Sequence, residues 1–151
     1  MRKEIWIAPA VFAADQVTKA LSVQIPPEGC VLIPGVLGLR YTRNTGMAFS
    51  LLSGQPWLLG VLGLVILAGA AWFLRGKKIP RLAFAALMSM AGGAAGNMVN
   101  RLVSGYVPDM IELLFIRFAV FNLADVALTV GCGLLIFYLL FWGEKESSSS
   151  R

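Results

Sequence analysis

Three apolar stretches, each long enough to cross the hydrocarbon core of a membrane, constrain the fold of this chain more than any other feature. They cover residues 57–74, 82–102 and 121–142, and a membrane-spanning helix needs about 20 mostly apolar residues. The whole 151-residue sequence is 58% hydrophobic and 14% charged, which lies outside the usual composition of soluble domains. The sequence therefore predicts an integral membrane protein.

Residues 5–23 form a fourth, less apolar stretch that also has the character of a helix. It contains Asp15 and Lys19, and a charged residue near the centre of a spanning helix costs about 2.5–3.5 kcal/mol on insertion scales. Residues four apart share one helix face, so these two side chains can form an ion pair that offsets the cost. The predicted fold is an all-α membrane protein with four transmembrane helices.

The distribution of lysine and arginine predicts the orientation of these helices, because cytoplasmic loops of membrane proteins carry an excess of both. Basic residues precede the first span, lie between the second and third, and follow the fourth: Arg2, Lys3, Arg75, Lys77, Lys78, Arg81 and Lys145. Both termini are therefore expected in the cytoplasm. This bias accounts for most of the net charge of +5, so we expect membrane lipids as partners and no nucleic acid.

The two outward-facing loops, residues 24–56 and 103–120, contain signals for β structure. Pro34-Gly35 is a strong turn dipeptide, and the residues on both sides of it are apolar and often β-branched. A hairpin lying on the membrane is expected there, and residues 106–121 are expected to add strands to this small extracytoplasmic β platform. We predict one membrane domain, residues 1–143, followed by a disordered serine-rich tail, residues 144–151.

The chain contains no histidine, which excludes histidine-based catalytic triads and argues against a zinc site. Its two cysteines, Cys30 and Cys132, are predicted at different membrane depths, so we expect no disulfide between them. No metal or cofactor is expected.

Asp109 and Asp125 are the strongest candidates for chemistry. They are 16 positions apart in a segment that returns to the same membrane face, so the two carboxyl groups can converge. Two close carboxyl groups do not readily ionise together, and such a pair supplies a general base and a general acid for amide hydrolysis. The alternative for Asp125 is ordinary helix-start chemistry, because an acidic side chain in the first turn complements the helix dipole.

Two further polar positions near the outer membrane face, Asn97 and Arg101, repeat the four-residue spacing of Asp15 and Lys19. Arg101 can extend its charge to the interface without any other role, or its forked guanidinium can hold a substrate carbonyl. The preceding glycines, Gly92 and Gly96, have the spacing that lets membrane helices pack closely.

Four ordered motifs resemble those of the bacterial lipoprotein signal peptidases, also called signal peptidase II. They are Asp15-Gln16-Val17-Thr18-Lys19, then Asn44-Thr45-Gly46-Met47-Ala48-Phe49-Ser50, then Gly96-Asn97-Met98-Val99-Asn100-Arg101, and finally Val107-Pro108-Asp109 with Phe121-Asn122-Leu123-Ala124-Asp125. Each motif is weak alone, but their order along almost the full length of the chain makes the resemblance specific.

The resemblance implies a monomeric aspartic endopeptidase of the bacterial cytoplasmic (inner) membrane, with its active site facing outward. Its substrates would be diacylglyceryl-modified prolipoproteins, cleaved immediately before the lipidated cysteine. By motif position, Asp109 and Asp125 would be catalytic, and Asn44 and Arg101 would bind the substrate backbone. Supporting roles would belong to four further motif residues: Asp15, Lys19, Asn97 and Asn122.

Three positions depart from the pattern of the family. Asn100 stands where the family usually has Asp, which removes a possible charge partner of Arg101, while Pro108 and Met47 replace smaller residues. Two other functions stay open: a small four-span transporter using Asp15 and Lys19 at the membrane midplane, and a non-catalytic scaffold for lipoprotein maturation.

Overall fold

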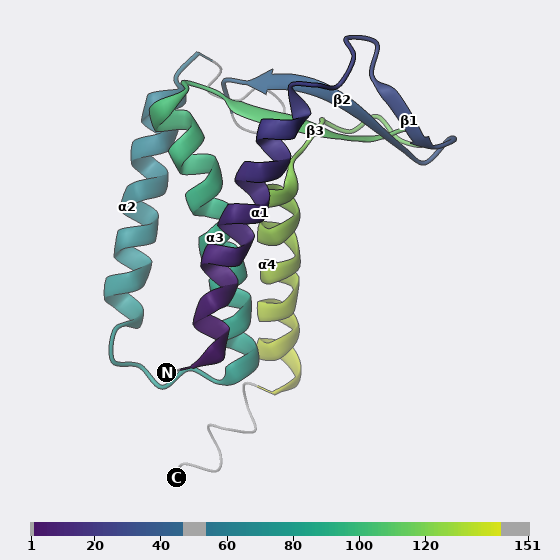
Figure 1. Ribbon diagram of the computed structural model, residues 1–151. Coiled ribbons are helices and arrows are strands. Elements are labelled where there is room, and N and C mark those ends of the chain that lie inside the picture. Colours follow the sequence, from purple (N-terminus) through teal and green to yellow (C-terminus); the bar gives the residue numbers. More distant parts are fainter. Residues whose placement is uncertain (1, 47–53, 143–151) are drawn as a thin grey trace.

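The computed structural model describes residues 2–46 and 54–142 and consists of a helical bundle with a small sheet attached at one end (Figure 1). A 3-10 turn, η1 (Lys3–Trp6), leads into α1 (Ile7–Ser22). The other helices are α2 (Pro56–Leu74), α3 (Arg81–Val103) and α4 (Leu123–Phe141). Residue 47 and the tail predicted for 144–151 lie outside the described residues.

The predicted spans agree with the helices to within two residues at each end. Within the described ranges, α2, α3 and α4 are long and apolar enough to cross a membrane. α1 has 16 residues, which corresponds to about 24 Å of helix, so it falls short of that length. The start of α1 and the end of α4 lie at the end of the bundle away from the sheet (Figure 1).

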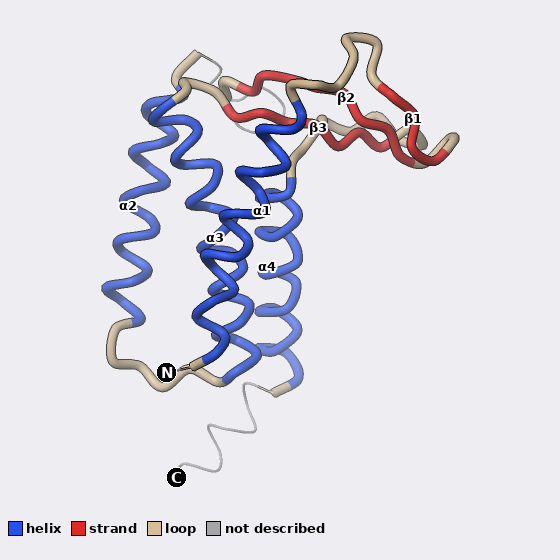
Figure 2. Tube along the Cα trace, viewed as in Figure 1, coloured by secondary structure: helices blue, strands red, loops and turns tan. Residues whose placement is uncertain are grey.

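The expected β platform is present as a three-stranded antiparallel sheet with the order β1-β2-β3 (Figure 2). β1 (Cys30–Ile33) and β2 (Leu37–Asn44) form the predicted hairpin around Pro34-Gly35, where Gly35 takes the positive φ of 71° that glycine tolerates. β3 (Val107–Leu113) comes from the second outer segment. The register places Asp109 opposite Thr42, next to the Asn44 end of β2.

α3 is the central helix, and it packs closely against α1 and α4 through glycines. A Cβ atom built on Gly92 would lie 2.5 Å from the Ala8 carbonyl oxygen of α1. One built on Gly93 would lie 2.5 Å from the Ala124 carbonyl oxygen of α4. Because backbone atoms occupy these positions, only glycine permits such close approach. The close packing predicted at Gly92 is therefore confirmed, and a Cβ built on Gly96, the other predicted position, would meet the Asp15 side chain of α1.

Candidate active site

The end of the three packed helices next to the sheet contains a group of buried polar side chains. Asp15, Lys19, Asn97, Asp109 and Asn122 are each at most 6% exposed. Polar groups at this depth require hydrogen-bond partners, since an unsatisfied one costs stability. The partners of these five residues therefore define the site.

Asp109 projects from β3 and accepts hydrogen bonds on both carboxyl oxygens. The side-chain amide of Asn44, at the end of β2, donates to Oδ2 at 2.9 Å. The side-chain amide of Asn122 donates to Oδ1 at 2.6 Å. Burial raises the pKa of the Asp109 carboxyl above its ordinary value, and nearby Asp125 adds to the rise, whereas the two amide donors oppose it.

Asp125 lies in the first turn of α4 and forms a capping box with Asn122, the N-cap residue. The Asn122 backbone N–H donates to Asp125 Oδ2 at 3.1 Å, and the Asp125 backbone N–H donates to Asn122 Oδ1 at 3.1 Å. The side-chain amide of Asn97 donates to the other carboxyl oxygen of Asp125 at 2.8 Å. Asp125 therefore has the helix-start role considered from the sequence, and the capping box holds its carboxylate beside Asn122.

Asn122 connects the two carboxyl groups. Its backbone bonds to Asp125 while its side chain bonds to Asp109, so one residue holds both acids at the same place. The Asn122 amide also donates to Asn97 Oδ1 at 3.2 Å. The structure thus brings Asp109 and Asp125 together, as their spacing predicted.

The predicted ion pair of α1 contacts the residues next to these two acids. Lys19 Nζ is 2.8 Å from Asp15 Oδ2, and it donates to Asn97 Oδ1 at 2.8 Å. Asp15 Oδ1 accepts the Ala124 backbone N–H at 2.9 Å, at the start of α4. The pair therefore links α1 to α3 and α4, and it reaches Asp125 through a single residue, Asn97.

Asn100 bonds to residues of α1 and not to Arg101, the partner considered from the sequence. Its Oδ1 accepts from Lys19 Nζ at 3.0 Å and from Gln16 Nε2 at 3.2 Å. This side chain therefore faces α1, whereas Arg101, the next residue on the helix, faces another direction. The concern that Asn100 removes a charge partner of Arg101 is misplaced, because the residue at position 100 acts on Lys19.

Arg101 lines a cavity of about 730 Å³ together with both acids. One guanidinium nitrogen donates to the Gly46 carbonyl oxygen at 2.9 Å. The buried Nε has no hydrogen-bond partner among the described residues. Apolar side chains of α4 and of the segment before it form much of the remaining wall: Phe118, Val120, Phe121, Val126, Leu128 and Val130.

Sequence reasoning missed two contributors to the site. Gln16 donates to Asp15 Oδ2 at 3.0 Å and exchanges hydrogen bonds with Asn100. Its place beside Asp15 in the first motif was the available signal. The Ala124 N–H was the other contributor, and no sequence pattern marks a backbone donor.

Comparisons with known proteins show the family of this chain. A family model described as signal peptidase (SPase) II matches residues 7–141. The lipoprotein signal peptidase of Brevibacillus brevis is 38% identical over 144 residues, covering 93% of this chain and 96% of that protein. The one of Thermosynechococcus vestitus is 36% identical over 132 residues, covering 83% and 84%.

Solved structures show the same relationship in three dimensions. A bacterial membrane enzyme determined by the in meso method at 2.3 Å resolution superposes with a TM-score of 0.84 and 30% identity, covering 98% of this chain and 91% of that one. A second such structure, at 1.9 Å resolution, gives a TM-score of 0.81 with the same identity over 92% and 93%. The chain belongs to the signal peptidase II family and is an aspartic-type peptidase.

Proposed function

We propose that this peptidase removes signal peptides from diacylglyceryl-modified prolipoproteins, cleaving immediately before the lipidated cysteine. The observation that supports this most directly is the shared attachment of Asp109 and Asp125 to Asn122 at the wall of one cavity. The curated relatives carry the name lipoprotein signal peptidase, and their substrate class is transferred here. The same family membership favours a peptidase over the transporter and the scaffold.

Asp125 is assigned the role of general base. It accepts from the Asn97 amide and the Asn122 backbone, and it lies in the first turn of α4, where the helix dipole favours a negative charge. Asp109 is assigned the proton, because burial and the neighbouring carboxylate raise the pKa of its carboxyl group. The two acids thus differ in environment, which is how one site obtains an acid and a base.

In the proposed reaction, Asp125 takes a proton from water as the water oxygen attacks the scissile carbonyl carbon. Protonated Asp109 donates a hydrogen bond to the carbonyl oxygen, which stabilises the negative charge that develops there. The proton on Asp125 then passes to the leaving nitrogen as the C–N bond breaks. The products are a new carboxyl terminus on the signal peptide and a free amine on the lipidated cysteine.

Arg101 and Asn44 are assigned to the substrate backbone. The Arg101 Nε lacks a partner among the described residues, so it can donate to a peptide carbonyl entering the cavity. Asn44 donates to Asp109, and a substrate that displaces this bond would receive the same amide. Asp15, Lys19, Asn97 and Asn122 hold the two acids in place, through the contacts that join α1, α3 and α4.

The proposed setting is the bacterial inner membrane, with the protein acting as a monomer and as one domain over residues 1–143. The sheet and the cavity lie at the extracytoplasmic surface in this proposal, and the basic end of the bundle lies in the cytoplasm. This orientation follows from the distribution of lysine and arginine. The apolar wall of the cavity suits a substrate that carries lipid chains.

The test is cleavage of a diacylglyceryl-modified prolipoprotein by the purified full chain in liposomes. Asp109→Asn and Asp125→Asn are each expected to lower the rate roughly a hundred- to ten-thousandfold, the usual contribution of a general acid or base. Glu28→Gln makes the same chemical change at an exposed loop residue outside the cavity and should leave the rate unchanged.

Retention of full activity by either aspartate variant would refute the catalytic assignment. Sequencing the amino terminus of the product tests the cleavage position separately. Cleavage at an earlier bond would leave residues before the lipidated cysteine, and cleavage at a later bond would remove the cysteine from the product. Asp15→Asn adds a comparison with the transporter alternative. A transporter loses flux in this variant and tolerates Asp109→Asn.

A further inference from the structure

The end of the bundle away from the sheet contains a second cavity, between α2 and α3, that the proposed peptidase function does not use. Its volume is about 510 Å³. Apolar side chains from α2, α3 and η1 line its interior: Ile5, Ala71, Leu74, Phe84, Leu87 and Met88. Four basic residues stand at its edge: Arg2, Arg75, Lys77 and Lys78.

This cavity exists because α2 and α3 separate along their length. Near the sheet, a Cβ on Gly60 would lie 2.6 Å from Leu102, and one on Gly63 would lie 3.4 Å from Met98. Toward the end away from the sheet, Figure 1 shows α2 diverging from α3. The two helices are therefore farther apart at the end of α2, where the cavity lies.

The basic edge is not neutralised by the described part of the chain. Among the described residues, Glu4 is the one acidic residue in the segments that form this end, and its carboxylate is 3.8 Å from Arg81, which does not line the cavity. Within residues 2–46 and 54–142, none of the four edge residues forms an ion pair with a carboxylate. Arg2 donates to the Ile79 carbonyl and lies over the Phe84 ring, with 5.1 Å between guanidinium carbon and ring centroid.

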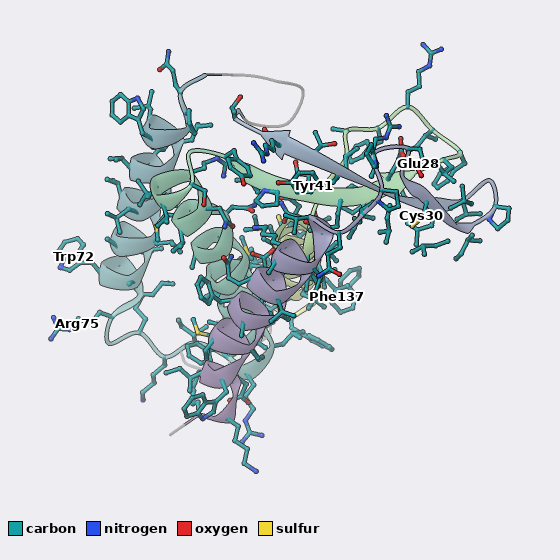
Figure 3. All side chains as sticks on the ribbon, turned by 45° about the horizontal axis from the view of Figure 1, so that its top comes forward. Glu28, Cys30, Tyr41, Trp72, Arg75 and Phe137 are labelled. Atoms are coloured by element: carbon teal, nitrogen blue, oxygen red, sulfur yellow. The ribbon has the colours of Figure 1, made fainter. Side chains whose placement is uncertain are left out.

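Figure 3 shows that Trp72 and Arg75 extend outward from the lower end of α2, away from the bundle. Trp72 is 78% exposed, and tryptophan favours the interface between hydrocarbon and headgroups. The cavity therefore opens at headgroup depth, with charge at its edge and apolar side chains inside. Basic pockets between membrane helices are suited to anionic lipid headgroups.

We propose that this cavity binds one anionic phospholipid from the membrane leaflet at the end of the bundle away from the sheet. The phosphate lies among Arg2, Lys77 and Lys78, and part of an acyl chain fills the space between α2 and α3. The lipid replaces the packing that α2 lacks at this end. This proposal is independent of the peptidase mechanism.

Native mass spectrometry of the full chain in detergent tests the proposal, with phosphatidylglycerol and phosphatidylcholine of identical acyl chains as probes. Wild type is expected to retain phosphatidylglycerol in preference to phosphatidylcholine. Arg2→Gln combined with Lys78→Gln should weaken phosphatidylglycerol binding by roughly fivefold for each charge removed, as expected for a basic side chain near an anionic surface.

The matched control is Lys3→Gln combined with Arg81→Gln, which removes two charges at the same end from residues outside the cavity. It should bind phosphatidylglycerol more tightly than the first double variant does, because neither Lys3 nor Arg81 lines the cavity. Equal losses in both double variants would mean diffuse surface attraction and would overturn the proposal. So would equal retention of the two lipids by wild type.

A second pair of variants tests the acyl-chain part without changing charge. Ala71→Trp fills the cavity and should abolish the preference, whereas Ala70→Trp, at a neighbouring exposed position outside the lining, should not. Competition with inorganic phosphate completes the test. Displacement of the lipid by phosphate at equal concentration would show that the headgroup alone binds, which contradicts the proposal.

Discussion

α3 has two interfaces that are built from similar residues and have opposite properties. The interface with α1 and α4 contains Gly92 and Gly93 in contact with backbone atoms, and it encloses the ion pair of α1. The interface with α2 also contains glycines and is close at Gly60, but Figure 1 shows the two helices diverging toward the end away from the sheet. The polar groups of this bundle are therefore held where several helices close around them.

The largest expected effect comes from removing one member of the enclosed ion pair. Lys19→Met leaves the Asp15 carboxylate, which is 0% exposed, without its cation. Breaking a buried pair in this way costs about 3–5 kcal/mol. Unfolding of the purified protein in detergent, followed by circular dichroism, measures the loss.

The control for this variant is the double change Asp15→Asn with Lys19→Met. It removes both charges, so it should recover most of the stability lost in the single variant. If Lys19→Met unfolds like wild type, the enclosed interface does not depend on the pair. The contrast between the two interfaces of α3 would then rest on packing alone.

Gly93→Ala should give the next largest effect, because its new methyl group meets the Ala124 backbone oxygen at 2.5 Å. Backbone cannot move aside without separating α3 from α4, and such overpacking costs about 1–3 kcal/mol. Gly69→Ala on α2 meets no atom within 4 Å and should be neutral or slightly stabilising. Gly69 lies on the face of α2 opposite Gly60, so this variant controls for an added methyl group in a membrane helix. Equal destabilisation of both variants in the same unfolding assay would show that the loss in Gly93→Ala does not come from the contact with α4.

Asn44→Ala removes the hydrogen bond from the sheet to Asp109, and its effect is measured in the pH dependence of the activity. The Asn44 amide lowers the pKa of Asp109 by donating to its carboxylate, so its removal raises that pKa further. If Asp109 acts in the protonated form, activity falls as pH rises through this pKa. The alkaline limb of the pH–rate profile should therefore move to higher pH in Asn44→Ala.

Thr42→Ala is the matched control for this pH shift, because Thr42 lies opposite Asp109 on β2 and lines the same cavity. The alkaline limb of the pH–rate profile of Thr42→Ala should lie at the same pH as that of wild type. A shift of the Asn44→Ala profile to lower pH would assign the proton to the other carboxyl group.

A smaller loss than that of Gly93→Ala is expected for Gly60→Ala, at the close end of the α2 interface. The added methyl group meets the end of the Leu102 side chain at 2.6 Å. Leu102 is 43% exposed, so it can rotate away, and we expect a cost below about 1 kcal/mol. A loss as large as that of Gly93→Ala would show that α2 is held as firmly as α1 and α4.

Much of the site could be predicted because its chemistry requires particular residue types at particular spacings. Asp109 and Asp125 were predicted to converge because the segment that contains them returns to the same membrane face, and the Asp15–Lys19 pair was predicted from the helix period. The partners of Asn100 could not be predicted this way. Its rotation toward Lys19 depends on how α1 crosses α3, and neighbouring residues on a helix point in directions about 100° apart.

Hydrophobic length, turn residues and charge act locally, so the helices, the hairpin and the two acids could be predicted from the residue pattern. Three other features arise from how the helices pack: Asn122 joins the two acids, Lys19 reaches Asp125 through Asn97, and α2 diverges from α3 (Figure 1). Each of these depends on the distance between helices. That distance is set by which glycines meet backbone atoms across an interface, and a pattern along one chain does not contain this information.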